Sequence, residues 1–280
     1  MTIGFCTDSN SQLPPELASR YDAEIVPLTV IVDGESFLEG EELDADAFYA
    51  RYADGATPVV STAAPSPGQF VTAYERLAAR GATEILSIHL GSAISATFNA
   101  ARLAADLSPV PVRAVDTGVA SFAIACCLWE AAEAVAKGAG IEEAAALAES
   151  VGASCGNLFV VGALGIVRAG GRMLQDVLPD APDAIPVLSM GSDGKIVPIG
   201  QARSPMEAAV AMASHIRSAG TGLRVGISVA DEAATPIREA LEELLKGAPE
   251  VIDLVRYRVG PSVGAHTGPG TAGAVYYPSR

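Results

Sequence analysis

The stretch that decides the fold is Glu84-Ile-Leu-Ser-Ile-His-Leu90, which leads directly into Gly91-Ser92-Ala93-Ile94-Ser95-Ala96-Thr97. Its first part is a short apolar run typical of a buried strand, and the second part predicts the start of a helix over Ser92–Asp106. The free N–H groups and the dipole at a helix start favour an anion, and three hydroxyl side chains add donors here. Capping alone also explains these residues, with Ser92 as the N-cap and Ser95 in the first turn.

Outward from this stretch, strands and helices alternate along the N-terminal half of the chain. The predicted strands are Met1–Cys6, Glu24–Val32, Glu84–Leu90 and Val112–Val115, and the predicted helices are Leu13–Tyr21, Asp44–Tyr52, Pro67–Arg80, Ser92–Asp106, Val119–Ala136 and Ile141–Ser150. This alternation predicts a layered, largely parallel α/β domain over residues 1–155.

The pattern changes in the second half. The predicted strands there are Leu158–Leu164, Ile185–Met190, Lys195–Ile199, Leu223–Ala230 and Val251–Val259, with helices at Pro205–Ser218 and Thr235–Lys246. The segment Met190–Lys195 contains Gly-Ser-Asp-Gly and predicts a hairpin turn between two strands. We therefore expect a second, smaller α+β domain with an antiparallel component over residues 156–280.

The composition excludes several classes of protein. With 18 Lys+Arg against 33 Asp+Glu, the net charge is −15, and there is no basic run. A nucleic-acid surface needs clustered cations, so nucleic acid and anionic membranes are poor partners. Two uncharged stretches, Ser150–Val167 and Val259–Ser279, are long enough to span a membrane but are interrupted by glycine or proline. Neither is expected to cross a membrane.

The N-terminus and the cysteines indicate a cytoplasmic protein. The first residues lack the basic region and the long apolar region of an export signal. The four cysteines are Cys6, Cys126, Cys127 and Cys155, and they show no Cys-x-x-Cys spacing. We expect them to be reduced, buried and structural.

The chain shows no self-sufficient catalytic motif. Gly260-Pro-Ser262-Val-Gly264 fits the G-x-S-x-G pattern, but a nucleophile elbow needs a helix after the serine, and this stretch is rich in Gly and Pro. No acidic residue follows Asp253. A P-loop and a dinucleotide fingerprint are absent, and the three histidines lack metal-site spacing. We therefore expect no catalytic residue, no metal and no cofactor.

A second candidate segment is Val59–Gly68, a polar loop before a helix. Thr62 supplies a hydroxyl in this loop. The alternative interpretation is a capped loop, with Ser66 as the N-cap and Pro67 at the first helical position. The residues alone leave both interpretations open.

A set of motifs in collinear order covers essentially the whole chain. The motifs are Thr7-Asp8-Ser9, Val26-Pro27-Leu28, Asp33-Gly34, Thr62-x-x-Pro65-Ser66-Pro67, Ser87 to Thr97, Asp116-Thr117, Arg168-Ala-Gly-Gly-Arg172, Pro186-Val-Leu188 and Gly260 to Gly270. Together they resemble the DegV family of fatty-acid-binding proteins, which act as the lipid-carrying subunit of bacterial fatty acid kinase. The resemblance implies a two-domain α/β fold with a narrow apolar ligand tunnel between the domains. It implies a carrier that holds a long-chain, palmitate-like fatty acid, and catalysis in a separate ATP-dependent kinase.

The resemblance also implies roles for individual residues. Thr62 and Ser95 match the two family hydroxyls that hydrogen-bond the fatty acid carboxylate. His266 and Arg203 match residues near the head group or on the surface offered to the kinase subunit. Taken without the resemblance, His266 is a hydrogen-bonded loop histidine and Arg203 a solvated surface residue. The motif from Arg168 to Arg172 is either a phosphate or partner site or a helix-terminating turn, of which we favour the turn.

The chain departs from the family pattern at its candidate site. Ala63 and Ala64 replace the usual Ser-Gln after Thr62, and Ala96 replaces the usual glycine. These changes leave head-group binding as the expectation and the preferred acyl length open. The alternative function is a stand-alone esterase or acyl-transfer enzyme that uses Ser262 and His266.

Overall fold

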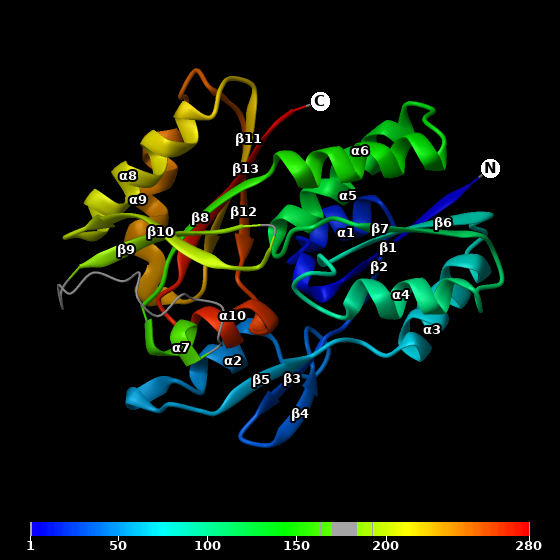
Figure 1. Ribbon diagram of the computed structural model, residues 1–280, viewed down its shortest axis with the longest axis horizontal. Coiled ribbons are helices and arrows are strands. Elements are labelled where there is room, and N and C mark those ends of the chain that lie inside the picture. Colours follow the sequence, from blue (N-terminus) through cyan, green and yellow to red (C-terminus); the bar gives the residue numbers. More distant parts are fainter. Residues whose placement is uncertain (1, 163, 170–183, 192, 280) are drawn as a thin grey trace. The chain divides into compact units, whose positions relative to one another are not determined.

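The computed structural model describes residues 2–162, 164–169, 184–191 and 193–279 (Figure 1). The chain divides into two compact units. The first unit comprises residues 1–42 and 62–154, and the second comprises residues 43–61 and 155–280. The predicted domains meet at a single boundary after residue 155, whereas residues 43–61 group with the C-terminal part of the chain.

The first unit is built on a parallel sheet of four strands. The strands are β1 (Ile3–Asp8), β2 (Glu24–Val26), β6 (Glu84–His89) and β7 (Val112–Asp116). Their order is β2-β1-β6-β7, and each neighbouring pair is parallel. The central strands β1 and β6 are almost entirely buried, as a sheet covered on both faces requires. The predicted parallel α/β architecture is confirmed.

Helices cover both faces of this sheet (Figure 1). They are α1 (Pro15–Arg20), α3 (Pro67–Ala79), α4 (Thr97–Ala105), α5 (Phe122–Ala136) and α6 (Ile141–Ser154). On one face, Phe70, Tyr74 and Leu77 of α3 form a core with the alanines of α4 and with Cys6 and Ile85 of the strands. On the other face, α5 is buried along most of its length, which explains why its sequence is apolar on every side.

The predicted strand Glu24–Val32 is divided in the structure. Its first part is β2 of the parallel sheet, and its second part is β3 (Thr29–Val32) of a separate sheet with the order β4-β3-β5, where β4 is Glu35–Leu38 and β5 is Val60–Ala63. The break lies at Pro27, which has no N–H to donate to a ladder. The predicted loop Val59–Gly68 likewise begins as a strand, because Val60 and Thr62 are β-branched and suit the extended conformation.

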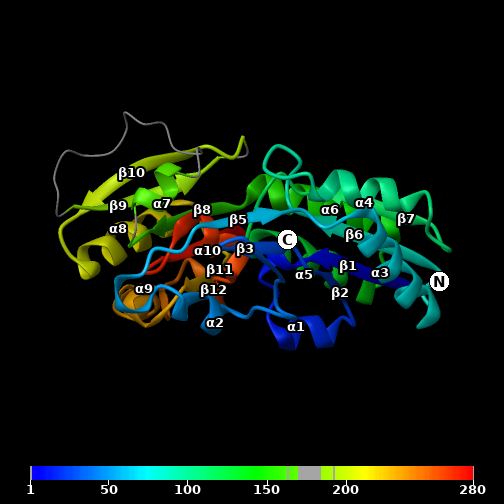
Figure 2. The same ribbon diagram turned by 90° about the horizontal axis from the view of Figure 1, so that it is seen from below.

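The second unit is a mixed sheet with two helices packed on one face. Its strands are β8 (Gly156–Val160), β9 (Ile185–Met190), β10 (Ile196–Ala202), β11 (Leu223–Val229), β12 (Val251–Arg258) and β13 (Ala272–Pro278), in the order β10-β9-β8-β13-β11-β12. The pairs β8–β9, β9–β10, β8–β13 and β11–β13 are antiparallel, and β11–β12 is parallel. Helices α8 (Pro205–Ser218) and α9 (Thr235–Leu245) lie side by side in both views (Figures 1 and 2). The predicted antiparallel component and the β9–β10 hairpin are confirmed.

Three elements of the second unit were not predicted. They are α7 (Leu164–Ala169), α10 (Pro261–Thr267) and β13. The Gly/Pro-rich segment around Ser262 is therefore a helix, with Pro261 at its first position, where the missing N–H costs little. Gly273 of β13 lies where an added Cβ would be 2.3 Å from the carbonyl oxygen of Leu158. Gly273 therefore weakens the sequence signal for a strand, but its missing side chain allows β13 to approach β8 closely.

Helix α2 (Ala45–Ala50) belongs to the second unit because it packs on α10. An added Cβ on Gly264 would lie 2.6 Å from the Tyr49 hydroxyl and 2.7 Å from a ring carbon of Phe48, so the two helices are in close contact. Arg258 also donates to Asp46 at 2.7 Å. These contacts explain why residues 43–61 group with the second unit although they lie in the N-terminal half of the sequence.

Replacement of Gly152 tests the packing of the first unit. A Cβ at this position of α6 would lie 2.4 Å from the backbone oxygen of Thr117, so Gly152→Ala must displace the helix or the loop. We expect a loss of about 1–3 kcal/mol in the free energy of unfolding, measured by urea denaturation. The matched control is Gly68→Ala in α3, where the new methyl group meets only the Ser66 hydroxyl at 3.8 Å. This control should gain up to about 1 kcal/mol, and equal stability of the two variants would contradict the packing argument.

Candidate functional site

The order of the parallel sheet identifies its carboxyl edge as a candidate site. The chain passes from β1 to β2 on one side and later returns to β6 on the other side of β1. The direction of the strand order therefore changes between β1 and β6. Open parallel α/β sheets bind ligands outside the carboxyl ends of the strands at such a point. Asp8 ends β1 here, and Leu90–Thr97 follows β6.

Ser95 was predicted to lie in the first turn of a helix, but in the structure it lies in the loop after β6. Helix α4 begins at Thr97, and Ala96 is its N-cap without a side-chain hydrogen bond. The preceding residues form a turn in which the backbone N–H groups of Ile94 and Ser95 both donate to the Gly91 oxygen, at 2.9 and 3.0 Å. The predicted N-cap, Ser92, instead donates its N–H to Asp116 Oδ1 at 3.0 Å. This tertiary hydrogen bond fastens the turn to the end of β7.

The Ser95 hydroxyl is nevertheless attached to the start of α4. The Thr97 N–H donates to Ser95 Oγ at 3.3 Å, and the hydroxyls of Ser95 and Thr97 are 2.9 Å apart. When Thr97 donates its hydroxyl proton, Ser95 Oγ accepts from Thr97 twice, and its own proton is available to an external acceptor. Ser95 is half-buried and Thr97 is fully buried. Thr97 thus supports the candidate residue Ser95, a role that its place in the sequence motif did not reveal.

Thr62 lies on a separate element of the same unit. It is a half-buried residue of β5, three residues before Pro65. The alternative interpretation of this segment is correct for its last residues: Ser66 caps α3 in a capping box with Gln69, and Pro67 occupies the first helical position. Thr62 takes no part in this cap, because the capping hydrogen bonds run between Ser66 and Gln69.

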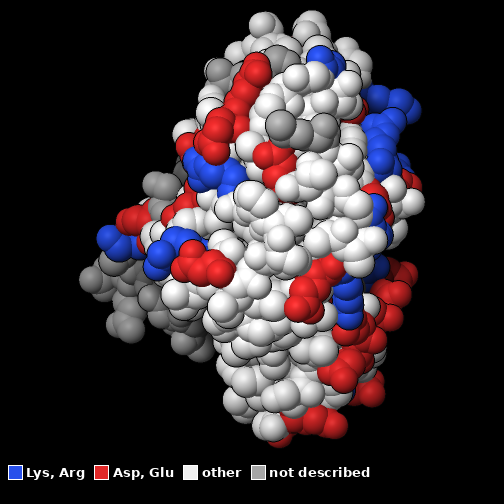
Figure 3. All heavy atoms as spheres, turned by 90° about the vertical axis from the view of Figure 1, so that its right-hand side faces the viewer, with Lys and Arg blue, Asp and Glu red and all other residues white. Residues whose placement is uncertain are grey.

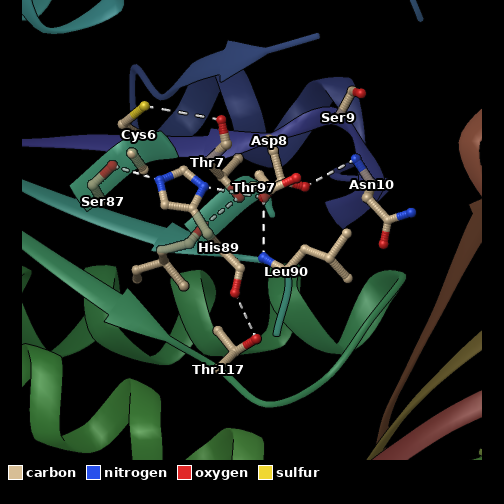
Figure 4. A network of polar contacts seen from close by, with 12 residues as sticks. Cys6, Thr7, Asp8, Ser9, Asn10, Ser87, His89, Leu90, Thr97 and Thr117 are labelled. Atoms are coloured by element: carbon tan, nitrogen blue, oxygen red, sulfur yellow. Dashed lines mark hydrogen bonds and ion pairs between the residues drawn. The ribbon is translucent and has the colours of Figure 1, made fainter. Parts of the chain in front are cut away.

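A buried carboxylate joins the ends of β1 and β6 (Figure 4). Asp8 is fully buried, and its Oδ2 accepts from the backbone N–H of Leu90 and from His89 Nδ1, each at 3.0 Å. Its Oδ1 accepts from the Asn10 N–H at 3.1 Å. A buried carboxylate is costly unless its oxygens are satisfied, and these three donors satisfy it. Because an ionised carboxylate only accepts, Nδ1 of His89 carries the proton.

The hydrogen bonds continue from His89 into the core. His89 Nε2 lies 2.6 Å from Ser87 Oγ, which lies 2.9 Å from the Tyr74 hydroxyl. Tyr74 also donates to the Ala101 oxygen at 3.2 Å. Burial is the main cause that raises the pKa of Tyr74 well above its ordinary value, so the phenol stays protonated. A chain of side chains therefore links α3, β6 and β1.

Ser87, His89 and Asp8 have the hydrogen-bonding order of a serine hydrolase triad. Their burial argues against that chemistry, because all three side chains are inaccessible to solvent. The Ser87 hydroxyl is further occupied by Tyr74. The sequence analysis assigned no function to His89. Its one local signal is a polar residue within the apolar run Glu84–Leu90, and its partner Asp8 lies 81 residues away in the sequence.

The loop after β7 holds the same edge from the other side. Thr117 Oγ1 donates to the His89 oxygen at 2.7 Å, and the Gly91 N–H donates to the Val119 oxygen at 2.9 Å. An added Cβ on Gly91 would lie 2.8 Å from the carbonyl carbon of Gly118, so only glycine permits this approach. The loops after β6 and β7 are therefore fixed against each other.

Strain is stored where this loop enters α5. Ser121 has φ 60° and ψ −150°, a conformation that L residues rarely adopt. Its N–H donates to Asn10 Oδ1 at 2.9 Å, which ties α5 to the segment after β1. Strained backbone of this kind concentrates at functional sites. The strain thus agrees with the position of the candidate site at this edge.

The other two predicted residues belong to the second unit. His266 is half-buried near the end of α10, so it lies in a helix and not in the expected loop. Arg203 is exposed just before α8, and its backbone N–H donates to Glu207 Oε2 at 2.9 Å. Thr62 and Ser95 belong to the first unit.

The structure also bears on the residues of the alternative function. Ser262 is 1% exposed inside α10, so its hydroxyl is shielded from a substrate. The Gly/Pro-rich stretch around it forms a helix, contrary to expectation, but this helix begins before the serine and not after it, as a nucleophile elbow would require. Of the motif from Arg168 to Arg172, Gly170, Gly171 and Arg172 lie outside the described residues.

The described residues carry few features of other site classes. Within the described ranges, no group of three His, Cys, Asp or Glu residues could hold a metal ion. No described helix has both the length and the hydropathy needed to cross a membrane. No disulfide joins the four cysteines, all of which lie in the described ranges. Three of them are buried, whereas Cys155 is partly exposed, which corrects the expectation for that residue. Burial raises the pKa of the Cys6 thiol well above its ordinary value, which keeps that thiol protonated.

Charges on the surface are mixed and mostly acidic. On the face drawn in Figure 3, acidic side chains gather along one border, and the basic side chains occur in small separate groups. In the first unit, Arg113 bonds Glu142 and Glu149 at 3.2 and 3.0 Å, and Arg80 bonds Glu24 at 2.6 Å. Basic groups that are paired in this way leave the face in view without the continuous cationic surface that phosphate backbones require.

Comparison with solved structures supports the assignment of the fold. A DegV family protein from Thermus thermophilus, described for its fatty acid binding, has a TM-score of 0.87 at 29% identity, with 100% of both chains covered. DegV from Bacillus subtilis, described as a fatty acid binding protein, has a TM-score of 0.85 at 26% identity, again over 100% of both chains. Both likenesses extend through the two units.

Comparison of sequences gives the family. A DegV domain-containing protein of Streptomyces coelicolor is 34% identical over 276 residues, which are 98% of this chain and 97% of the relative. The family model of the DegV proteins matches residues 2–279. The match spans the parallel sheet with its candidate site and the mixed sheet of the second unit. The chain is therefore a member of the DegV family.

Proposed function

We propose that this protein binds one long-chain fatty acid and holds its carboxylate at the carboxyl edge of the parallel sheet. The observation that carries the proposal is the Ser95 hydroxyl, which is fixed at the start of α4 by two contacts with Thr97. The likeness to two DegV proteins described as fatty-acid-binding supports this choice of ligand.

Ser95 suits a carboxylate for electrostatic reasons. When the Thr97 hydroxyl donates to Ser95, it strengthens the bond that Ser95 donates in turn, because linked hydroxyls polarise one another. The N-terminus of α4 adds a partial positive charge close to this hydroxyl. We assign Thr62 as the second hydroxyl donor, on the basis of the family resemblance and its half-buried position on β5.

The acyl chain supplies most of the affinity in this proposal. Burial of each methylene contributes about 0.8 kcal/mol, so a palmitate-like tail outweighs the head group. A hydrogen bond to a charged group contributes about 1.5–3 kcal/mol, and its direction fixes the orientation of the ligand. The tail therefore sets the affinity, and the hydroxyls set which end of the lipid is presented.

We further propose that the protein is a carrier and that a separate ATP-dependent kinase phosphorylates the bound carboxylate. The family resemblance suggests this partner, and His266 and Arg203 are the residues that we assign to the head group or to the kinase-facing surface. The exposed position of Arg203 before α8 suits contact with another protein. A cytoplasmic location is part of the proposal, because the cytoplasm supplies ATP for the kinase and keeps cysteine side chains reduced.

The first test concerns the cargo. Protein expressed in bacteria should carry about one long-chain fatty acid per chain, because a buried tail dissociates slowly in water. Denaturing extraction followed by mass spectrometry measures the bound lipid and its length. Delipidated protein that takes up no fatty acid would show that the ligand is wrong.

The second test concerns the carboxylate site. Ser95→Ala and Thr62→Ala should keep the fold and most of the lipid binding, whereas acyl phosphate formation by an added kinase should fall by about tenfold or more for each lost hydrogen bond. His266→Ala should behave in the same way. The matched control is Ser262→Ala, which removes a buried hydroxyl outside the proposed site and should leave phosphorylation unchanged. If Ser262→Ala abolishes activity and Ser95→Ala does not, the esterase alternative replaces the carrier.

The third test concerns the division of labour between carrier and kinase. The protein alone, with ATP and magnesium, should neither hydrolyse ATP nor form acyl phosphate, because its sequence contains no P-loop to hold the nucleotide phosphates. Addition of a compatible fatty acid kinase should yield acyl phosphate, detected as its hydroxamate. Sustained ATP hydrolysis by the pure protein would contradict the carrier role.

A further inference from the structure

We propose that Asp8 and His89 are positioning residues that hold the segment Leu90–Thr97, and thereby aim the Ser95 hydroxyl at the ligand carboxylate. The inference rests on the proposed function, and it assigns a purpose to a buried pair that the proposed function does not itself require. Neither side chain can touch the ligand, because both are fully buried. Their effect must therefore pass through the loop.

The path from Asp8 to Ser95 is short and consists of two hydrogen bonds along one segment. Asp8 Oδ2 accepts from the Leu90 N–H at 3.0 Å, which fixes the first residue after β6. The next residue, Gly91, accepts from the Ser95 N–H at 3.0 Å. Displacement of Leu90 would therefore move the carbonyl to which Ser95 is bonded.

His89 holds the start of this segment through two hydrogen bonds, one from its side chain and one to its backbone. Its ring donates to Asp8 at 3.0 Å, and its backbone oxygen accepts from Thr117 Oγ1 at 2.7 Å (Figure 4). The residue is thus held by its side chain toward β1 and by its backbone toward the loop after β7. Thr7 Oγ1 adds a bond to the Ile88 oxygen at 2.9 Å, so the end of β6 has little freedom.

The alternative is that the pair only stabilises the fold. A purely structural role would weaken the binding of every ligand to the same extent, whereas a positioning role acts on the head group alone. The two roles are separated by a pair of ligands that differ only at the head group. Palmitate and 1-hexadecanol have the same chain length, and only palmitate carries a carboxylate.

The experiment measures the preference for palmitate over 1-hexadecanol with delipidated full-length protein and radiolabelled ligands at equilibrium. Asp8→Asn keeps the size of the side chain but replaces one accepting oxygen with a donor. We expect the preference to fall by about tenfold, the equivalent of one charge-assisted hydrogen bond, with hexadecanol affinity unchanged. Equal losses for both ligands, or a preference unchanged from the wild type, would overturn the inference.

The matched control is Tyr74→Phe, at the far end of the same network. This variant removes the hydrogen bonds to Ser87 and to the Ala101 oxygen but leaves every bond of the Leu90–Thr97 segment in place. It should lower the free energy of unfolding and keep the preference for palmitate. A loss of preference in this control equal to that of Asp8→Asn would show that the effect does not arise from the hydrogen bonds of the Leu90–Thr97 segment and would overturn the inference.

A second pair of variants decides the matter if Asp8→Asn does not fold. In His89→Asn the side-chain amide can donate to Asp8 in place of Nδ1, whereas His89→Leu cannot donate. The preference should survive in the first variant and fall in the second, and equal preferences in the two would overturn the inference. If the wild-type protein itself shows no preference for palmitate, the proposed function fails as well. If the wild-type protein prefers palmitate and all these variants keep that preference, the positioning role is wrong and the proposed function stands.

Discussion

The carboxylate of Asp8 is the interaction on which the candidate site depends. It lies inside the protein at the end of β1, where an isolated charge would cost several kcal/mol. Two backbone N–H groups and the His89 ring donate to it. One of these donors follows β1, and the other two lie at the end of β6. A rearrangement of the loop after β6 would remove the Leu90 N–H from this charge. The loop is therefore confined by the cost of an unsatisfied buried charge.

The neighbouring residues of the Thr7-Asp8-Ser9 motif extend the same constraint. Thr7 bonds the backbone of β6, and Ser9 donates to Glu39 while it accepts from the Leu28 N–H at 2.9 Å. Three consecutive side chains thus fasten the end of β1 to three different segments. A motif that the sequence analysis used only to identify the family has a physical purpose, which is to assemble the loops of the carboxyl edge.

The second unit is held mainly by packing. The ion pair between Arg258 and Asp46 is largely exposed, at 44% and 84% of the two side chains, so it contributes at most about 1 kcal/mol. Phe48 of α2, in contrast, is fully buried and lies against α10 at Gly264. Burial of such an aromatic side chain contributes more than the ion pair. The association of α2 with α10 therefore depends on the absence of a side chain at Gly264.

The sequence by itself determined the fold class and the strands and helices with strong periodicity. The runs that became β1, β6, α3 and α5 carry their own hydrophobic pattern, and such a pattern depends only on which faces of an element are buried. The collinear motifs also indicated the family and the candidate residues Thr62, Ser95, His266 and Arg203. Local chemistry further predicted the cap at Ser66.

Only the tertiary structure decided the rest. Helix α4 starts at Thr97 and not at Ser92, because the residues between them form a turn closed on the Gly91 oxygen, and the Ser92 N–H fastens this turn to Asp116 at the end of β7. β13 and α10 escaped prediction because their glycines serve close contacts with distant segments and weaken the local signal. The partnership of Asp8 with His89 joins residues 81 positions apart. No local pattern encodes such contacts, because they exist only once β1 and β6 lie side by side.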